Sequence, residues 1–168
     1  MKEKTHKGFT IIEFLVYVTI LAIVINTMGG VALNVFRVGA RTDAIQEVAH
    51  NGRFAMQKIG QVVKLADSVI LPVTEGSYLV LGFEQNIEGT TTFDVFKKTL
   101  RIKEGNKDYV DLTTSKVSVD NIKFTKVKSL TGRDSVKIEM NISFNNQKNL
   151  PEYLFENFIT GVFTIGGK

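Results

Sequence analysis

The sequence of 168 residues contains no cysteine, which excludes disulfide bonds and thiolate metal sites. Histidine is scarce, with only His6 and His50, and no serine or cysteine nucleophile signature lies near His50. We therefore interpret His50 as a solvated helix residue. Charge is almost absent between Phe9 and Phe36, where Glu13 is the only charged residue. The chain therefore has few of the side chains that usually act as nucleophiles or metal ligands, and the long apolar segment is its main feature.

The segment from Phe9 to Phe36 is long enough to cross a membrane as one helix. At about 1.5 Å of rise per residue it spans roughly 40 Å, compared with ~30 Å of bilayer hydrocarbon. Lys2, Lys4 and Lys7 precede it, and positively charged flanks tend to stay in the cytoplasm. We expect a single-pass cytoplasmic (inner) membrane protein with its leader in the cytoplasm and its C-terminal domain outside.

Glu13 places a carboxylate inside this apolar segment, at a cost of about 2.5 to 3.5 kcal/mol on insertion scales. One interpretation is that Glu13 lies about one turn inside the membrane and reaches back to headgroups and water. Another interpretation uses its spacing. A cut between Gly8 and Phe9 would create an α-amine four residues before Glu13, on the same helix face and at the positive end of the helix dipole.

The order lysine, glycine, phenylalanine, threonine, two aliphatic residues and glutamate, followed by an unbroken apolar helix, resembles the class III signal of type IV prepilins and type II secretion pseudopilins. In that family a membrane aspartyl peptidase cuts after the glycine and methylates the new N-terminal phenylalanine. The resemblance implies that Gly8 ends the leader, that Phe9 is the mature, N-methylated terminus, and that Glu13 guides assembly. A secretory signal fits less well, because its cleavage site follows the apolar core.

The resemblance also implies a function and a set of partners. It implies a non-enzymatic structural subunit, a minor pilin or pseudopilin of a type IV pilus, a type II secretion system or a DNA-uptake filament. The partners are the prepilin peptidase/methyltransferase, other pilin or pseudopilin subunits, the lipid bilayer and an inner-membrane assembly platform. No cofactor is expected. The strands after the helix are similar to those of the J-type pseudopilin and its pilus and competence counterparts.

Toward the end of the apolar segment, Gly29 and Gly30 interrupt the helical pattern, and three interpretations stay open. Each glycine costs roughly 0.8 to 1 kcal/mol in a helix interior, which favours bending or fraying. Small residues also permit close packing of membrane helices. The family resemblance adds the third interpretation, a helix that partly unwinds when packed in a filament.

The next stretch is amphipathic and predicts that the helix continues to about Ala66 or Asp67. The expected apolar face consists of Ile45, Val48, Gly52, Ala55, Met56, Ile59, Val62, Val63 and Ala66. This rhythm runs through Asn51-Gly52-Arg53, which elsewhere would indicate a turn. We expect a leader over 1–8, the membrane half of the helix over 9–35, and an amphipathic half-helix with an antiparallel β domain over 36–168.

After Pro72 the period of the pattern changes to two, which predicts strands separated by short turns. The predicted strands are Tyr78 to Phe83, Thr91 to Lys103, Tyr109 to Thr113, Val117 to Lys128, Val136 to Phe144 and Phe158 to Ile165. In the strand from Val136 to Phe144, alternate residues from Val136 onward should face inward. One helix covering one face of an antiparallel sheet predicts an α+β fold.

Other possible sites in the domain are weak. Glu104, Asp108 and Asp111 lack the regular oxygen spacing of a calcium loop. Lysines that bear on nucleic-acid binding are 116, 123, 126, 128, 137 and 148, with Lys126 and Lys128 on one side of a strand and Lys137 on a neighbouring strand. No aromatic residue is interleaved with them, which favours a solvated sheet face over a nucleic-acid interface.

The aromatic residues near the C-terminus, Tyr153, Phe155, Phe158 and Phe163, are interpreted as core or subunit-contact residues. An alternative function is a single-pass, membrane-tethered binding domain, such as one for DNA, that does not polymerise. A tether requires neither Gly8 nor Glu13, so the N-terminal signature favours the filament subunit.

Overall fold

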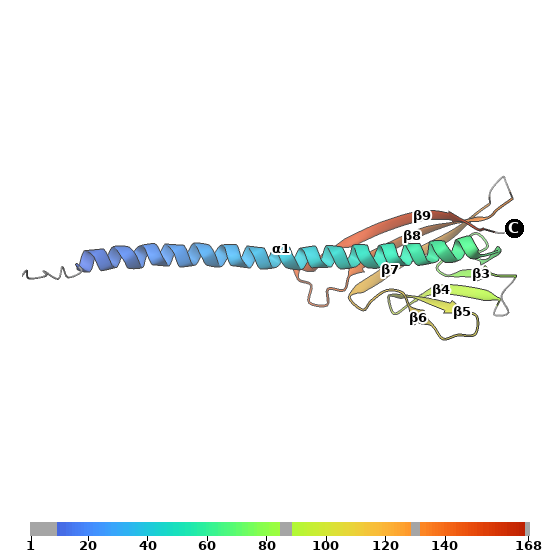
Figure 1. Cartoon of the computed structure of the whole chain (residues 1–168), viewed down its shortest axis with the longest axis horizontal. Helices are drawn as coiled ribbons and strands as arrows, with labels where there is room; N and C mark the ends of the chain where they lie inside the picture. The colour runs from blue at the N-terminus through green and yellow to red at the C-terminus, as the bar shows by residue number, and fades with distance from the viewer. Residues whose placement is uncertain (1–9, 85–88, 129–131, 167–168) are drawn as a thin grey trace, which may run out of the picture. The chain divides into compact units, whose positions relative to one another are not determined.

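The computed structural model describes residues 10–84, 89–128 and 132–166. The chain divides into two compact units, residues 1–40 and residues 41–168, and the helix α1 (Ile11–Leu65) contributes to both (Figure 1). The predicted domain boundaries at residues 8 and 35 remain predictions.

Helix α1 ends close to where the apolar rhythm predicted, with Lys64 in its last turn, where a cation complements the helix dipole. Gly29 and Gly30 are both helical, and a Cβ added at either position would meet no atom within 4 Å. In this chain by itself, the helix is therefore continuous through the glycine pair.

The second unit contains two antiparallel sheets. One sheet has the order β1-β3-β4-β5-β6 and the other the order β2-β7-β8-β9. The elements are β1 (Ser68–Leu71), β2 (Glu75–Gly76), β3 (Leu79–Gly82), β4 (Thr90–Phe96), β5 (Thr99–Glu104), β6 (Val110–Asp111), β7 (Val117–Val127), β8 (Ser135–Phe144), the 3-10 turn η1 (Pro151–Tyr153) and β9 (Glu156–Thr164). The predicted α+β class is confirmed, but two sheets replace the single sheet expected. Strand β2 lies between β1 and β3 in sequence yet pairs with β7, and local periodicity carries no information about such a crossover.

The predicted strand Thr91 to Lys103 is wrong, because the chain reverses in its middle. Strands β4 and β5 form a hairpin whose two-residue turn consists of Lys97 and Lys98, with φ angles of 49° and 66°. Such turns usually carry asparagine or glycine, which adopt positive φ at low cost. Since two lysines occupy this turn, the sequence contains no turn signal here.

The core lies between the second part of α1 and both sheets (Figure 1). The predicted helix face is confirmed from Val48 to Ala66, whereas Ile45 is exposed and Ala44 is buried in its place. Ala44, Val48, Gly52 and Met56 follow one another at four-residue steps, so the buried stripe begins one position earlier than predicted.

Strand β8 alternates as predicted. Val136, Ile138, Met140 and Ile142 are fully buried, and the residues between them are half-buried on the opposite face. Phe144, also predicted to face inward, packs against the core and is half-buried at the end of the strand. Of the C-terminal aromatics, Phe155 and Phe163 pack against the core, while Phe158 on β9 is 63% exposed.

Helix α1 and strand β9 fit together through alternating small and large residues. The opposed pairs are Gly52 with Ile159, Met56 with Gly161, and Gly60 with Phe163. A Cβ at Gly60 would lie 2.5 Å from Phe163 Cε1, and one at Gly161 would lie 2.6 Å from Met56 Cε. Four helical residues rise about 6 Å and two strand residues about 6.6 Å, so the two repeats stay in step. Each of these glycines therefore leaves the space that a large side chain of the facing element fills.

We expect a fragment of residues 36–168 to fold as a soluble monomer, because the core residues from Ala44 to Ile165 all lie within it. Circular dichroism should show mixed helix and strand with one cooperative melt. A spectrum typical of a disordered chain would contradict this architecture.

Candidate functional site

The predicted processing residues Gly8 and Phe9 lie outside the described residues, and the description begins at Thr10. The Oγ1 atom of Thr10 accepts a hydrogen bond of 3.3 Å from the backbone N–H of Glu13. Thr10 therefore acts as the N-cap of α1, and Glu13 lies in the first turn. The spacing Thr10-x-x-Glu13 matches a capping box, a signal that could have identified Thr10 from the sequence.

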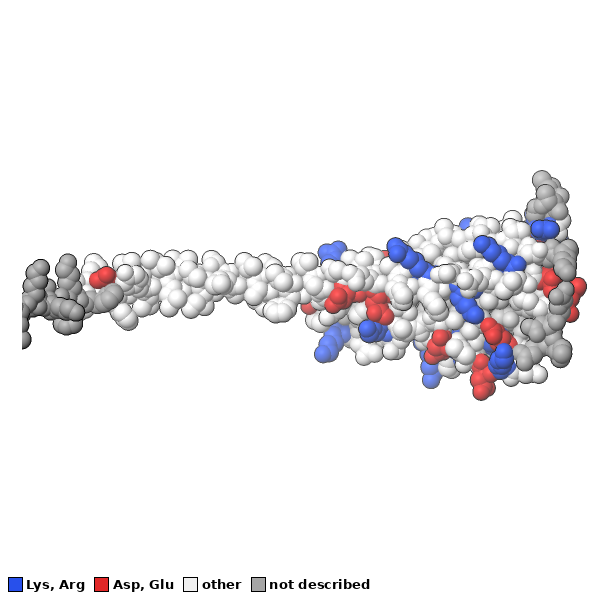
Figure 2. All heavy atoms as spheres, in the orientation of Figure 1, with Lys and Arg blue, Asp and Glu red and all other residues white. Residues whose placement is uncertain are grey.

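The side chains of α1 up to residue 39 are all exposed within this chain. Even Val24, the least exposed of the large apolar residues in that stretch, keeps 44% of its surface accessible. Figure 2 shows this segment as a nearly uncharged surface, whereas basic and acidic side chains gather on the second unit. An apolar surface of this extent requires lipid or other apolar helices as its surroundings.

Two threonines in this segment satisfy their hydroxyl groups within the helix. Thr19 Oγ1 donates to the Leu15 carbonyl at 2.8 Å and Thr27 Oγ1 donates to the Val24 carbonyl at 2.9 Å. Such bonds lower the cost of placing a polar group in hydrocarbon. Among the described residues, α1 is the one helix long and apolar enough to cross a membrane.

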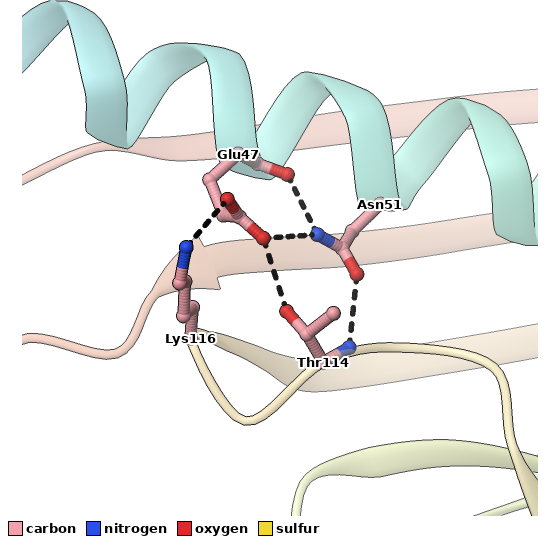
Figure 3. Close-up of polar contacts among 4 residues, drawn as sticks. All are labelled: Glu47, Asn51, Thr114 and Lys116. Atoms are coloured by element: carbon pink, nitrogen blue, oxygen red, sulfur yellow. Dashed lines mark hydrogen bonds and ion pairs between the residues drawn. The ribbon is translucent and has the colours of Figure 1, made fainter.

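A polar cluster fixes the first buried turns of α1 in the second unit to the loop between β6 and β7 (Figure 3). Asn51 Nδ2 donates to the Glu47 carbonyl at 2.9 Å and to Glu47 Oε1 at 3.1 Å, and Asn51 Oδ1 accepts from the Thr114 backbone N–H at 2.9 Å. Thr114 Oγ1 and Lys116 Nζ also donate to the Glu47 carboxylate. Asn51 thus serves the tertiary fold, which explains why Asn51-Gly52 does not form a turn.

The Glu47 carboxylate makes the stability that this cluster gives to the fold depend on pH. Burial raises the pKa of Glu47, but hydrogen bonds from Lys116, Thr114 and Asn51 outweigh burial, so the pKa lies below its ordinary value. A carboxylate with a lowered folded pKa stabilises the fold above its unfolded pKa of about 4.3. That stabilisation is lost as the pH falls through the folded pKa.

We expect Glu47→Gln to lower the melting temperature near about pH 6 and to flatten part of its fall toward about pH 3. Thermal unfolding followed by circular dichroism at a series of pH values measures both effects. Glu84→Gln, at an exposed position, is the control and should keep the wild-type profile. Parallel profiles for Glu47→Gln and wild type would contradict a role for the Glu47 charge.

Three of the strand lysines considered for nucleic acid form ion pairs with carboxylates. These pairs are Lys123 with Glu75 at 2.6 Å, Lys126 with Asp134 at 2.7 Å, and Lys137 with Glu139 at 2.8 Å. Because Lys126 is opposite Val136 and Thr125 is opposite Lys137, Lys126 and Lys137 point to opposite faces of the sheet. These two lysines therefore do not form one basic patch.

An interleaved group of aromatic and basic residues occurs instead on the first sheet. The Arg101 guanidinium lies 4.5 Å from the centre of the Phe96 ring and 4.2 Å from that of Tyr109. Asp94 accepts two hydrogen bonds from the same guanidinium, at 3.0 and 2.7 Å. Much of the hydrogen-bonding capacity of Arg101 is therefore used within the sheet.

The remaining sequence candidates do not come together. His50 is exposed on α1, as predicted. Glu104 forms ion pairs with Lys58 and Lys107, at 3.5 and 3.9 Å. Within residues 10–84, 89–128 and 132–166, no three His, Cys, Asp or Glu side chains are grouped so that they could hold a metal ion.

Comparison with protein families places a match at the N-terminus. Residues 4–25 match the family model described as the prokaryotic N-terminal methylation motif. Comparisons of the chain with curated proteins and with solved structures found no match. The matched stretch contains Gly8, Phe9, Thr10 and Glu13 and leads directly into the exposed apolar part of α1.

Proposed function

This chain carries the N-terminal methylation motif of the type IV prepilin and pseudopilin family, and from that premise we propose that it is a filament subunit cleaved after Gly8 and methylated at Phe9. The finer proposal is a minor pilin or pseudopilin of a type IV pilus, a type II secretion system or a DNA-uptake system. The observation that carries it is the motif followed at once by an apolar helix segment with exposed side chains.

The apolar part of α1 must be covered by lipid or by other helices at every stage, and the proposed order of events follows from this requirement. Before assembly, lipid surrounds residues 11–36, with the leader in the cytoplasm and the second unit outside. A prepilin peptidase/methyltransferase then removes the leader. At an inner-membrane assembly platform the helix exchanges lipid for the helices of neighbouring subunits. This exchange keeps the apolar surface out of water throughout, and dispersion contacts and polar pairs then favour the filament.

Glu13 is the charged residue of the apolar segment, and it gains a partner when the helix exchanges lipid for neighbouring helices. In the isolated membrane form its carboxylate bears a desolvation cost, relieved in part by the helix N-terminus that Thr10 caps. In a filament we propose that it meets the α-amine of a neighbouring Phe9. Methylation keeps the positive charge of this amine, and the pair is stronger in a low-dielectric bundle than it would be in water.

We expect Glu13→Ala and Glu13→Gln to insert and to be cleaved, but to enter filaments at a lower ratio than wild type. Glu13→Asp, shorter by one methylene, should be intermediate. The measurement is the ratio of filament-borne to membrane-borne chain in cells that express the rest of the system. Thr19→Val is the matched control: it changes a polar residue in the same helix whose hydroxyl is bonded within the helix, and it should assemble normally.

Wild-type incorporation of Glu13→Ala would show that charge pairing does not recruit this subunit. That result, with normal cleavage, would favour the alternative of a membrane-tethered binding domain that does not polymerise.

A further inference from the structure

The second unit contains a cavity of about 640 Å³, within the range of roughly 300 to 1,000 Å³ typical of small-molecule sites. Its walls come from three separate parts of the chain: the β4–β5 turn, residues 115–120 just before and at the start of β7, and the segment 143–156, which runs from the end of β8 through η1 to the start of β9. The filament proposal assigns no role to this cavity.

A carboxylate lies on the cavity wall. Asp120 Oδ1 accepts hydrogen bonds from Lys98 Nζ at 3.1 Å and Ser118 Oγ at 3.0 Å, and Asp120 Oδ2 accepts one from Ser143 Oγ at 2.5 Å. Burial raises the pKa of Asp120, but the hydrogen bonds from Ser143, Lys98 and Ser118 together outweigh burial, so the pKa is below its ordinary value. The side chain remains one-third exposed. It is therefore an oriented, ionised acceptor, and three of its roughly four lone-pair sites are used, which leaves one for a ligand.

The charges and polar groups of the lining indicate the class of ligand. Lys97 and Lys98 are balanced by Asp120 and Glu156, so the lining offers no net attraction to an ion. The other polar lining groups are mostly hydroxyls and amides, from serine, threonine, tyrosine and asparagine. The Asn145 and Asn146 amides already donate to the Ser115 and Leu150 carbonyls, and Asn146 Oδ1 accepts from the Leu150 N–H. The Ser118 and Ser143 hydroxyls donate to Asp120 but can still accept, which suits a ligand that carries hydroxyl donors.

The cavity also has an aromatic wall. The rings of Phe144 and Tyr153 are stacked, with centroids 5.2 Å apart and an interplanar angle of 14°. Phe155 and Leu154 add further apolar surface. A sugar ring has C–H groups on one face and hydroxyls at its edge, so it can place that face on an aromatic wall while its edge reaches polar groups.

We propose that this cavity binds a neutral oligosaccharide, with Asp120 accepting from sugar hydroxyls and Tyr153 contacting a sugar face. The site would give the subunit a carbohydrate-binding activity. This inference is independent of the Glu13 assembly proposal, because every residue in it lies in the second unit.

The test uses the full chain, purified in a zwitterionic detergent that has no sugar headgroup. Isothermal titration with maltotriose, chitotriose and galactotriose measures binding of neutral trisaccharides, and sialyllactose is the acidic probe. We expect saturable binding of at least one neutral trisaccharide. Asp120→Asn and Tyr153→Ala should each weaken it about tenfold or more. Phe158→Ala, which removes an exposed aromatic ring outside the cavity, is the control and should bind as wild type does.

Hydroxyl-radical footprinting of the wild-type chain tests the location without any variant. The bound trisaccharide should protect Tyr153 and Phe155, and leave Phe158 as reactive as before. Failure of all three neutral trisaccharides to bind would overturn the proposal. Binding of sialyllactose alone, protection outside the cavity, or an equal loss in Phe158→Ala would do the same.

Discussion

Gly8→Leu should leave the chain entirely as precursor in cells that contain the prepilin peptidase. The methylation motif covers residues 4–25, and the proposed cleavage breaks the bond after Gly8. A branched side chain at Gly8 would occupy space that glycine leaves free beside that bond. Intact-mass analysis of membrane-extracted protein should show loss of residues 1–8 and addition of one methyl group in wild type, and neither change in the variant.

Thr5→Leu is the control for this experiment, because it adds a leucine to the leader away from the bond. It should be processed as wild type is. A wild-type chain that keeps its full N-terminus in the same cells would refute the processing proposal altogether.

Processing has a further consequence for the helix start. The proposed cleavage would remove Lys2, Lys4 and Lys7 and would leave an amine at Phe9, directly before the Thr10 cap. We therefore expect Gly8→Leu to block filament entry as well, since the amine that would pair with a neighbouring Glu13 never forms.

Gly60→Leu should strongly destabilise the second unit. Three atoms of the Phe163 ring lie within 2.8 Å of where a Cβ at Gly60 would be, and Phe163 packs against the core. Overpacking costs about 1 to 3 kcal/mol, and a whole leucine facing a ring belongs at the upper end of that range. Thermal unfolding should show a melting temperature lower by about 2 to 4 °C per kcal/mol.

A matched control and a double variant separate packing from helix propensity. The control is Gly39→Leu. Gly39 is in the same helix, but a Cβ added there would meet no atom within 4 Å, so this change should not lower the melting temperature. Gly60→Leu combined with Phe163→Ala should cost less than the sum of the two single changes, because the smaller side chain makes room for leucine. Strict additivity of the two changes would show that Gly60 and Phe163 do not oppose each other.

The N-terminal motif was predictable because it depends on consecutive residues. The run from Lys7 to Glu13 and the apolar segment after it are local features. The match to the N-terminal methylation motif confirms the resemblance to a class III signal that these residues predicted. The Glu47–Asn51–Thr114–Lys116 cluster and the cavity around Asp120 were not predicted. In the cluster, more than sixty residues separate Glu47 and Asn51 from Thr114 and Lys116, and the cavity is lined by three separate segments.

The sequence by itself determined the α+β class, the long helix and most of the strand β8 pattern, because each depends on the period of apolar residues within one element. Tertiary structure decided the β4–β5 hairpin, the division into two sheets, and the positions of α1 at which glycine makes room for a side chain of β9. Lys97 and Lys98 accept positive φ because the paired strands impose it. Gly52 and Gly60 are required by Ile159 and Phe163, about a hundred residues away in the chain. No local pattern encodes the side chain that will face a residue from another element, and that pairing emerged only when helix and strand packed together.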